Sequence, residues 1–264
     1  MGLSAAQRKR SQSESDPQFM QSLARGLQVL EAFTGLPPSV TIPQLAKETG
    51  LARAVVTRCL HTLVALGYVE EHERHYSICP HVLRLAGAYL SARSLPILAQ
   101  PLLEDLRDSL GESCSLGVLD GDEIVYVARA STTRIMAVSL HVGSRLPAYC
   151  TSMGRILLAA LPPDKLQAAL DRVTPIQRTP HSITDRAELQ QAIMAVANQG
   201  YAVVDQELEL GLRSVAVPVR DRNGRVVAAL NLGTNAMRLS VKDLKARVLP
   251  ELRAVAENLQ RLAG

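Results

Sequence analysis

The stretch LARAVVTRCLHTLVALGYV, residues 51–69, constrains the fold more than any other part of the sequence. On a helical wheel at about 100° per residue, residues 52–66 divide into an apolar side and a polar side, with Val64 as the one misfit. The apolar side holds Val56, Cys59, Leu60, Leu63 and Leu66, with Val55 at its edge. The polar side holds Arg53, Ala54, Thr57, Arg58, His61 and Thr62. The sequence therefore predicts an amphipathic helix whose polar face carries two arginines and no acid.

Two further helices are predicted before this one. Residues 22–33 have apolar positions at 23, 27, 30 and 33, which is the spacing of an amphipathic helix. Thr41, with Gln44 three positions later, predicts a capping box at the start of a helix over 42–49. Gly50 follows that helix and ends it, so only a tight turn separates it from the helix at 52–66.

A short hairpin is predicted after the third helix. Gly67 stands where a helix commonly ends on glycine, and residues 68–71 and 75–78 have the pattern of two paired strands. Helix, helix, tight turn, helix and hairpin is the order of elements in a winged helix-turn-helix.

The polar face of the third helix fits DNA. Arginine donates hydrogen bonds that phosphate oxygens and guanine edges accept, and the absence of acids removes repulsion. An ordinary solvated helix face is the alternative, because such faces often carry arginine. The surrounding order of elements favours DNA, and we expect Ala54 and Val55 to meet thymine methyl groups. The residues expected at the DNA are Arg25, Thr41, Arg53, Ala54, Val55, Thr57, Arg58, His61 and Arg74.

Beyond Pro80 the sequence alternates between strand and helix patterns. Residues 81–94 predict a helix that links two domains, and residues 95–113 predict another that Pro101 bends or restarts. Strands are expected at 115–120, 123–130, 135–142, 201–205, 214–221 and 226–232, and helices at 152–161, 164–170, 185–199 and 242–262. This mixture predicts an α+β domain in which helices flank an antiparallel sheet.

Composition limits the class of protein. The 264 residues are 47% apolar but only 3% aromatic, so the core must be aliphatic, and the formal charge of +4 permits contact with nucleic acid. Residues 1–18 are polar and predict a disordered arm. With neither a secretory signal nor an apolar run of membrane-spanning length in the sequence, we expect a cytoplasmic protein whose cysteines are reduced.

Motifs of enzyme chemistry are missing from the sequence. It has no glycine-rich dinucleotide loop and no P-loop, and TSMGR at 151–155 is not the G-x-S-x-G turn of a hydrolase. His72 and His75 lack a third metal ligand nearby, and no acid is marked to orient a pair of Cys150 and His141. We therefore expect no catalytic residues, no metal and no cofactor. A metabolite-binding or hydrolytic protein, whose winged helix is only an interaction module, is the alternative.

With both halves described, residues 19–262 resemble the IclR family of bacterial transcriptional regulators, and above all its Pca/Pob-type branch. The resemblance is carried by SLARGLQVLEAF, by the stretch at 51–69, and by LSARSLPILAQPLLEDL, DGDEIVYVARA, RIMAVSLHVGSRLPAYCTSMGRILLAAL, DQELELGLRSVAVPVRD and GRVVAALNL. It implies a winged helix-turn-helix at 19–80, a linker helix at 81–94 and a GAF-like effector-binding domain at 95–264. It also implies a homodimer or homotetramer on paired half-sites of promoter DNA, with protocatechuate, 4-hydroxybenzoate or β-ketoadipate as effector.

The resemblance also implies where the effector binds. The helix start at TSMGR, the loop DQELELGLRS and the strand AALNLG surround the implied pocket. Apolar walls that include Leu140 would hold a ring, backbone amides at the helix start would hold a carboxylate, and Arg155 and Arg213 are further cationic candidates. The implied effector-binding residues are Met136, Val138, Arg145, Ser152, Met153, Asp205, Glu207, Ser214, Asn231 and Gly233.

Two places depart from the family pattern. Ala52 stands where relatives often carry a capping side chain, and a lost cap costs a helix about 1 kcal/mol. The hairpin EEHERH lacks the common glycine turn, and its glutamates would repel phosphate. Contacts from the hairpin to DNA would therefore depend on Arg74, His72 or His75.

Overall fold

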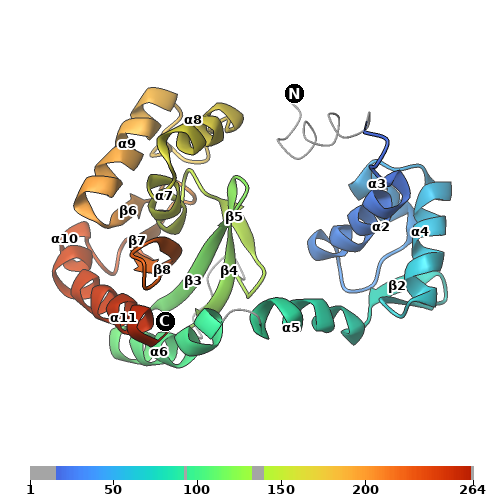
Figure 1. Ribbon diagram of the computed structural model, residues 1–264, viewed down its shortest axis with the longest axis horizontal. Helices are drawn as coiled ribbons and strands as arrows, with labels where there is room; N and C mark the ends of the chain where they lie inside the picture. The colour runs from blue at the N-terminus through green and yellow to red at the C-terminus, as the bar shows by residue number, and fades with distance from the viewer. Residues whose placement is uncertain (1–15, 92–93, 133–139, 263–264) are drawn as a thin grey trace. The chain divides into compact units, whose positions relative to one another are not determined.

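The computed structural model describes residues 16–91, 94–132 and 140–262 (Figure 1). The chain divides into two compact units, Met1–Ala92 and Arg93–Gly264. The arm predicted at 1–18 lies mostly outside the described residues, and so does most of the strand predicted at 135–142.

Helices and one hairpin make up the first unit, in the predicted order. Gln44 Oε1 accepts hydrogen bonds from both the amide and the hydroxyl of Thr41, each at 2.8 Å, as the capping pattern predicted. Gly50 and Gly67 adopt positive φ angles of 69° and 76°, which glycine reaches without a Cβ clash. The elements are α2 (Gln21–Ala32), η1 (Phe33–Gly35), α3 (Ile42–Thr49), α4 (Arg53–Ala65), β1 (Val69–His72), β2 (His75–Ile78), η2 (Pro80–Val82) and α5 (Leu83–Ser91).

The core of the first unit forms where the apolar side of α4 packs on α2 and α3. Val56 and Leu60 of α4 are buried against residues such as Val29 of α2 and Leu45 of α3. Leu66 differs from the prediction, because it is 59% exposed. It is the C-cap of α4, so the chain already turns away from the helix axis at that point.

A six-stranded antiparallel sheet forms the centre of the second unit, in the order β5-β4-β3-β8-β7-β6. Its strands are β3 (Ser113–Asp120), β4 (Glu123–Ala130), β5 (Arg145–Pro147), β6 (Ala202–Asp205), β7 (Leu212–Arg220) and β8 (Val226–Asn235). Its helices are α6 (Ser94–Leu110), α7 (Ser152–Ala159), α8 (Pro163–Arg172), α9 (Arg186–Gln199), α10 (Val241–Asp243), the π-helical turn η3 (Leu244–Val248) and α11 (Leu249–Leu262). The predicted α+β architecture is confirmed.

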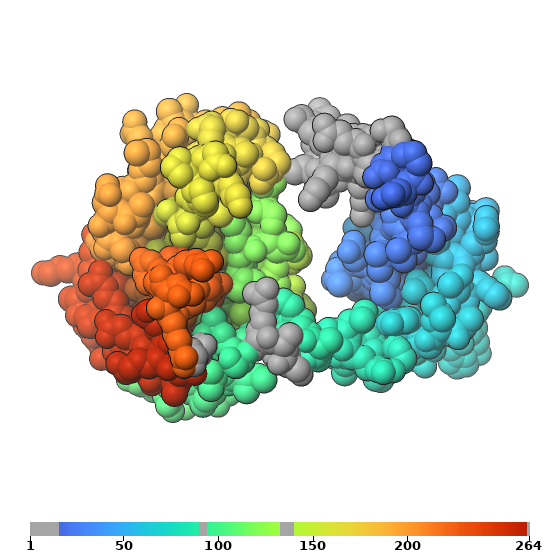
Figure 2. All heavy atoms as spheres, in the orientation of Figure 1, coloured from blue at the N-terminus to red at the C-terminus, as the bar shows by residue number. Residues whose placement is uncertain are grey.

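Each face of the sheet has its own apolar core. On one face, α6 and α11 cover side chains of β3, β7 and β8, and the two helices lie side by side in the space-filling view (Figure 2). On the other face, α7 packs on β3, β7 and β8, with α8 and α9 outside it (Figure 1). The second face is the one that leaves a cavity.

Three details of the second unit differ from the predictions. Helix α6 runs continuously from Ser94 to Leu110 with Pro101 inside it, so the helix does not restart at the proline. The predicted helix at 242–262 contains a π turn at Leu244–Val248, just before Pro250. Proline has no amide proton and its ring crowds the carbonyl four residues earlier, so a wider turn accommodates it. Strand β5 was not predicted, because three residues carry too little pattern.

Candidate DNA-binding face and effector cavity

The polar side of α4 is exposed as predicted. Arg53, Ala54, Thr57, Arg58 and His61 are all exposed, while Val55 is half-buried. The hydroxyl of Thr57 donates to the carbonyl of Arg53 at 2.9 Å, so its methyl group and the two arginines dominate the face. Ala52 provides no side-chain cap, as its residue type requires.

Other predicted DNA contacts lie on the elements around α4. Arg25 of α2 is exposed, and it lies near Cys59 together with Arg58. Burial raises the pKa of the Cys59 thiol, and the charges of Arg25 and Arg58 partly oppose that rise. Thr41 begins α3 and its hydroxyl is engaged by Gln44. Arg74 is exposed at the β1–β2 turn, where it adopts a φ of 65°.

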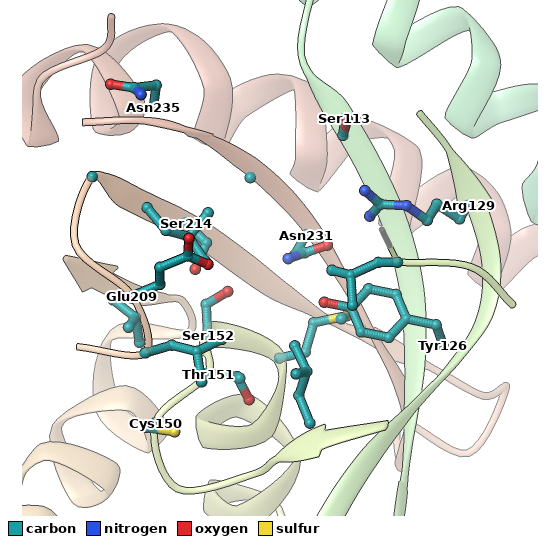
Figure 3. Close-up of a pocket in the computed structure, with 18 of the residues that line it drawn as sticks. Ser113, Tyr126, Arg129, Cys150, Thr151, Ser152, Glu209, Ser214, Asn231 and Asn235 are labelled. Atoms are coloured by element: carbon teal, nitrogen blue, oxygen red, sulfur yellow. The ribbon is translucent and has the colours of Figure 1, made fainter. Parts of the chain in front are cut away.

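In the second unit, a cavity of about 260 Å³ lies between the sheet and α7 (Figure 3). The space exists because the strands present small side chains to it. Ser113 pairs with Gly233, and Gly233 pairs with Ser214 on its other side, which makes a row of small residues across β3, β8 and β7. Apolar walls come from Leu140, Leu146, Met153, Val204, Leu208 and Leu212.

Two buried polar atoms at this cavity have no hydrogen-bond partner among the described residues. They are Ser152 Oγ, in a residue that is 1% exposed, and Asn231 Oδ1, in one that is 8% exposed. Ser152 starts α7, whose cap is the preceding Thr151, because Thr151 Oγ1 accepts from the amide of Gly154 at 3.2 Å. Buried polar atoms are nearly always satisfied, so these two need a partner from outside the described residues, and a ligand or a water molecule in the cavity can supply it.

Two charged side chains line the described part of the cavity. Arg129 of β4 lies at one side of it, and Glu209 lies in the loop between β6 and β7 (Figure 3). The hydroxyl of Tyr126 also points into the space (Figure 3). Burial raises the pKa of Tyr126 to about 12, so this phenol keeps its proton and can donate a hydrogen bond.

The predicted effector-binding residues separate into three groups. Ser152, Met153, Ser214, Asn231 and Gly233 line the cavity. Arg145, Asp205 and Glu207 are not among the lining residues. Met136 and Val138 lie outside the described residues.

The second group is held in ion pairs. Arg145 bridges Asp120 and Glu123 at 2.7 and 2.8 Å on an exposed surface. Asp205 pairs with Arg213 at 2.8 Å, and that guanidinium holds the pKa of the Asp205 carboxyl below its usual range.

Glu207 forms a buried ion pair with Arg155, another of the cations considered from the sequence. Both guanidinium Nη atoms donate to the carboxylate, at 2.7 and 2.5 Å, and Arg155 Nε donates to the carbonyl of Tyr149 at 3.1 Å. The carbonyl of Glu207 also accepts from the hydroxyl of Ser182 at 2.7 Å. This pair fastens the β6–β7 loop, which forms one wall of the cavity, to α7.

The sequence reasoning missed Arg129, Tyr126 and Glu209. The sequence did contain a signal for Arg129. EIVYVARA is apolar at most positions, and an arginine in a largely apolar strand indicates a specific structural or binding role for that residue. Glu209 carried no such signal, since it lies in a loop rich in acids. Both residues reach the cavity only through the pairing of strands distant in sequence.

The described residues support neither a metal site nor a nucleophilic cysteine. No group of three or more His, Cys, Asp or Glu side chains there could hold a metal ion. Cys150 lines the cavity, but burial raises the pKa of its thiol, which disfavours the nucleophilic thiolate. None of the described helices is both long and apolar enough to cross a membrane.

Comparison with known proteins assigns both units. Residues 22–73 match the IclR helix-turn-helix domain, and residues 87–261 match the C-terminal domain of the bacterial transcriptional regulator IclR. The Pca regulon regulatory protein of Pseudomonas putida is 49% identical over 92% of this chain and 84% of its own length. The p-hydroxybenzoate hydroxylase transcriptional activator of Acinetobacter baylyi is 35% identical over 92% of both chains.

Solved structures agree with these sequence matches. The crystal structure of a transcriptional regulator from Rhodococcus sp. RHA1 is 47% identical, has a TM-score of 0.80, and covers 93% of this chain and 98% of its own. The inducer-binding domain of an Acinetobacter PobR double mutant, in complex with 3-hydroxybenzoic acid, is 34% identical with a TM-score of 0.60. It covers 63% of this chain and 98% of its own. The chain therefore belongs to the IclR family of bacterial transcriptional regulators, within the branch of the Pca and PobR regulators of aromatic catabolism.

Proposed function

We propose that this regulator reads promoter DNA with the exposed face of α4 and responds to an aromatic or related carboxylic acid bound in the cavity. The observation that carries the effector half is the pair of unpartnered buried atoms, Ser152 Oγ and Asn231 Oδ1. A buried polar group without a partner costs about 1–3 kcal/mol. A ligand that brings hydrogen-bonding groups to both atoms recovers that free energy.

The cavity favours a small, flat and partly polar ligand. Leucine, valine and methionine side chains form its walls, and Tyr126, Arg129, Asn231 and the α7 start supply hydrogen-bonding groups. Such a set of apolar walls with a few fixed polar groups is typical of sites for small organic ligands. The names of the relatives support hydroxybenzoic acids as the first class to test, with β-ketoadipate as an aliphatic alternative.

The proposed DNA binding requires two copies of this chain. One α4 face with two arginines and a histidine gives too little charge for tight binding alone, so two copies on two half-sites are required. Exposed leucines on the first unit support self-association, because exposed apolar side chains favour contact with another protein surface. They are Leu23 and Leu27 on α2 and Leu83 and Leu85 on α5. We therefore propose a homodimer, or a homotetramer built from it, acting on promoter DNA in the cytoplasm.

A gel-shift experiment tests the DNA half. The DNA is the intergenic fragment upstream of the gene, at fixed salt, and the variants are Arg58→Ala and Arg261→Ala. Arg58→Ala should lose about 1–3 kcal/mol of binding free energy and relax base preference. Arg261 is exposed on α11 in the other unit, so its variant should bind as wild type does. Binding by the Arg58 variant equal to wild type would exclude α4 from the groove.

Thermal unfolding with candidate acids tests the effector half. Protocatechuate, 4-hydroxybenzoate and β-ketoadipate are each added to the full chain. A ligand at 100 times its Kd stabilises the folded state by about 2.7 kcal/mol, or about 5–11 °C for a domain of this size. If none of the acids shifts the melting temperature and no DNA is bound, the alternative of a metabolite-binding or hydrolytic protein gains support.

A further inference from the structure

We propose that Arg129 is the anion anchor of the cavity and holds the carboxylate of the effector on the β4 side. This inference rests on the proposed function, because it assumes that the cavity binds an organic acid. It names a residue and an orientation that neither the family match nor the names of the relatives assign.

Strand pairing places Arg129 at the cavity. Ser115 of β3 pairs with Arg129 on one side and with Asn231 of β8 on the other, so these three residues form one row across the sheet. Arg129 and Asn231 both line the cavity, and their side chains extend into the same region (Figure 3). The cation therefore lies in one row with an amide whose Oδ1 has no hydrogen-bond partner in the described part of the chain.

The guanidinium of Arg129 is fixed by hydrogen bonds but pairs with no acid among the residues that the structure describes. Nη1 donates to Ser115 Oγ at 2.8 Å and Nε donates to Ser131 Oγ at 2.9 Å, which leaves Nη2 without a partner among the described residues. The group also lies 5.7 Å from the centre of the Tyr126 ring. Neutral hydroxyls and a ring hold its position but cannot neutralise its charge.

The other arginines near the cavity provide a contrast. Arg145, Arg155 and Arg213 each pair with a carboxylate at 2.8 Å or less. Arg129 forms no such pair within the described ranges, although it is half-buried. Burial accordingly lowers its pKa. A half-buried cation without a counter-charge is costly unless an anion arrives, and a planar carboxylate matches the guanidinium geometry.

The remaining polar groups indicate the rest of the ligand. A carboxylate only accepts hydrogen bonds, so it cannot satisfy the acceptor Asn231 Oδ1. A hydroxyl group on the ligand can donate to that oxygen and can pair with Ser152 Oγ. The chemical class that fits the whole cavity is therefore a hydroxylated carboxylic acid, with its acid end at Arg129.

A thermodynamic cycle on the full chain tests the anchor. Titration calorimetry identifies the tighter binder of the two hydroxylated acids, 4-hydroxybenzoate and protocatechuate, and this acid is compared with its neutral amide on wild type, R129Q and R129K. Wild type should prefer the acid, and R129Q should bind the acid about 10- to 100-fold more weakly while its binding of the amide changes little. R129K keeps the positive charge but lacks the planar guanidinium, which binds a carboxylate through two parallel hydrogen bonds. Its affinity for the acid should therefore fall between those of wild type and R129Q.

Two controls separate this role from a structural one. R145Q removes an arginine whose ion pairs lie outside the cavity, and it should keep the wild-type preference for the acid. Ligand-free R129Q should melt close to wild type, because the lost hydrogen bonds are offset by removal of a poorly solvated charge. If R129Q still prefers the acid as strongly as wild type does, the role of Arg129 is refuted while the proposed effector class stands. If wild type binds none of the acids, the proposed effector class fails and the anchor fails with it.

Discussion

The buried ion pair between Arg155 and Glu207 gives a prediction with a large expected effect. The two side chains are only 5% and 9% exposed, and both guanidinium Nη atoms donate to the carboxylate. Glu207→Gln keeps the size of the side chain but leaves the Arg155 charge buried without its counter-charge. Removal of one partner from such a pair costs about 3–5 kcal/mol, since the remaining charge is neither solvated nor neutralised.

The assay is thermal unfolding of the full chain. A loss of about 3–5 kcal/mol lowers the melting temperature of a domain of this size by about 6–20 °C. The double variant Arg155→Met with Glu207→Leu removes both charges and should recover most of the loss. Effector binding should weaken in Glu207→Gln as well, because the pair fastens the loop that carries Leu208 and Glu209 at the cavity.

An exposed ion pair supplies the matched control. Asp120→Asn breaks a contact of 2.7 Å to Arg145, but the two side chains are 66% and 43% exposed. Solvent screens such pairs, so the cost should stay below about 1 kcal/mol. A melting temperature for Glu207→Gln that falls no further than that of Asp120→Asn would refute the reasoning about burial.

Three further predictions follow from single positions. Gly154→Ala should destabilise the second unit by about 1–3 kcal/mol or more in denaturant unfolding, because its Cβ would lie 2.0 Å from the carbonyl oxygen of Ala148. Gly26→Ala meets open space in α2 and should be neutral or stabilising there, so equal losses would contradict the packing argument. Ala52→Ser supplies the missing cap of α4 and should stabilise the first unit by about 1 kcal/mol. An unchanged midpoint of denaturant unfolding would show that the serine hydroxyl does not cap the helix. Glu209→Gln should raise calorimetric affinity for a dicarboxylate such as β-ketoadipate by up to about fivefold, with little effect on 4-hydroxybenzoate; an unchanged affinity for both acids would place Glu209 away from the ligand.

Local features of the first unit were predictable from the sequence. The second helix begins and ends at the predicted residues, and Gly50 and Gly67 take the positive φ angles expected after helices. The exposed face of α4 also follows the helical wheel. Periodicity and capping depend on residues within a few positions of one another, so a sequence contains them directly.

Features that depend on distant residues were not predictable in the same way. The choice between Arg129, Arg145, Arg155 and Arg213 as a ligand cation required knowledge of which one lacks an acid. Arg155 meets Glu207 from 52 positions away, and nothing in the local sequence marks that encounter.

The sequence by itself determined the winged helix-turn-helix, the antiparallel α+β second unit and the family. Through resemblance it also singled out Ser152, Ser214 and Asn231, which line the cavity. Only the tertiary structure decided which charges are neutralised and which face the cavity, because ion pairing is a matter of spatial neighbours. Arg129 is half-buried and pairs with no acid in the described ranges, which is visible only after the strands are paired and the other arginines have been matched with their acids.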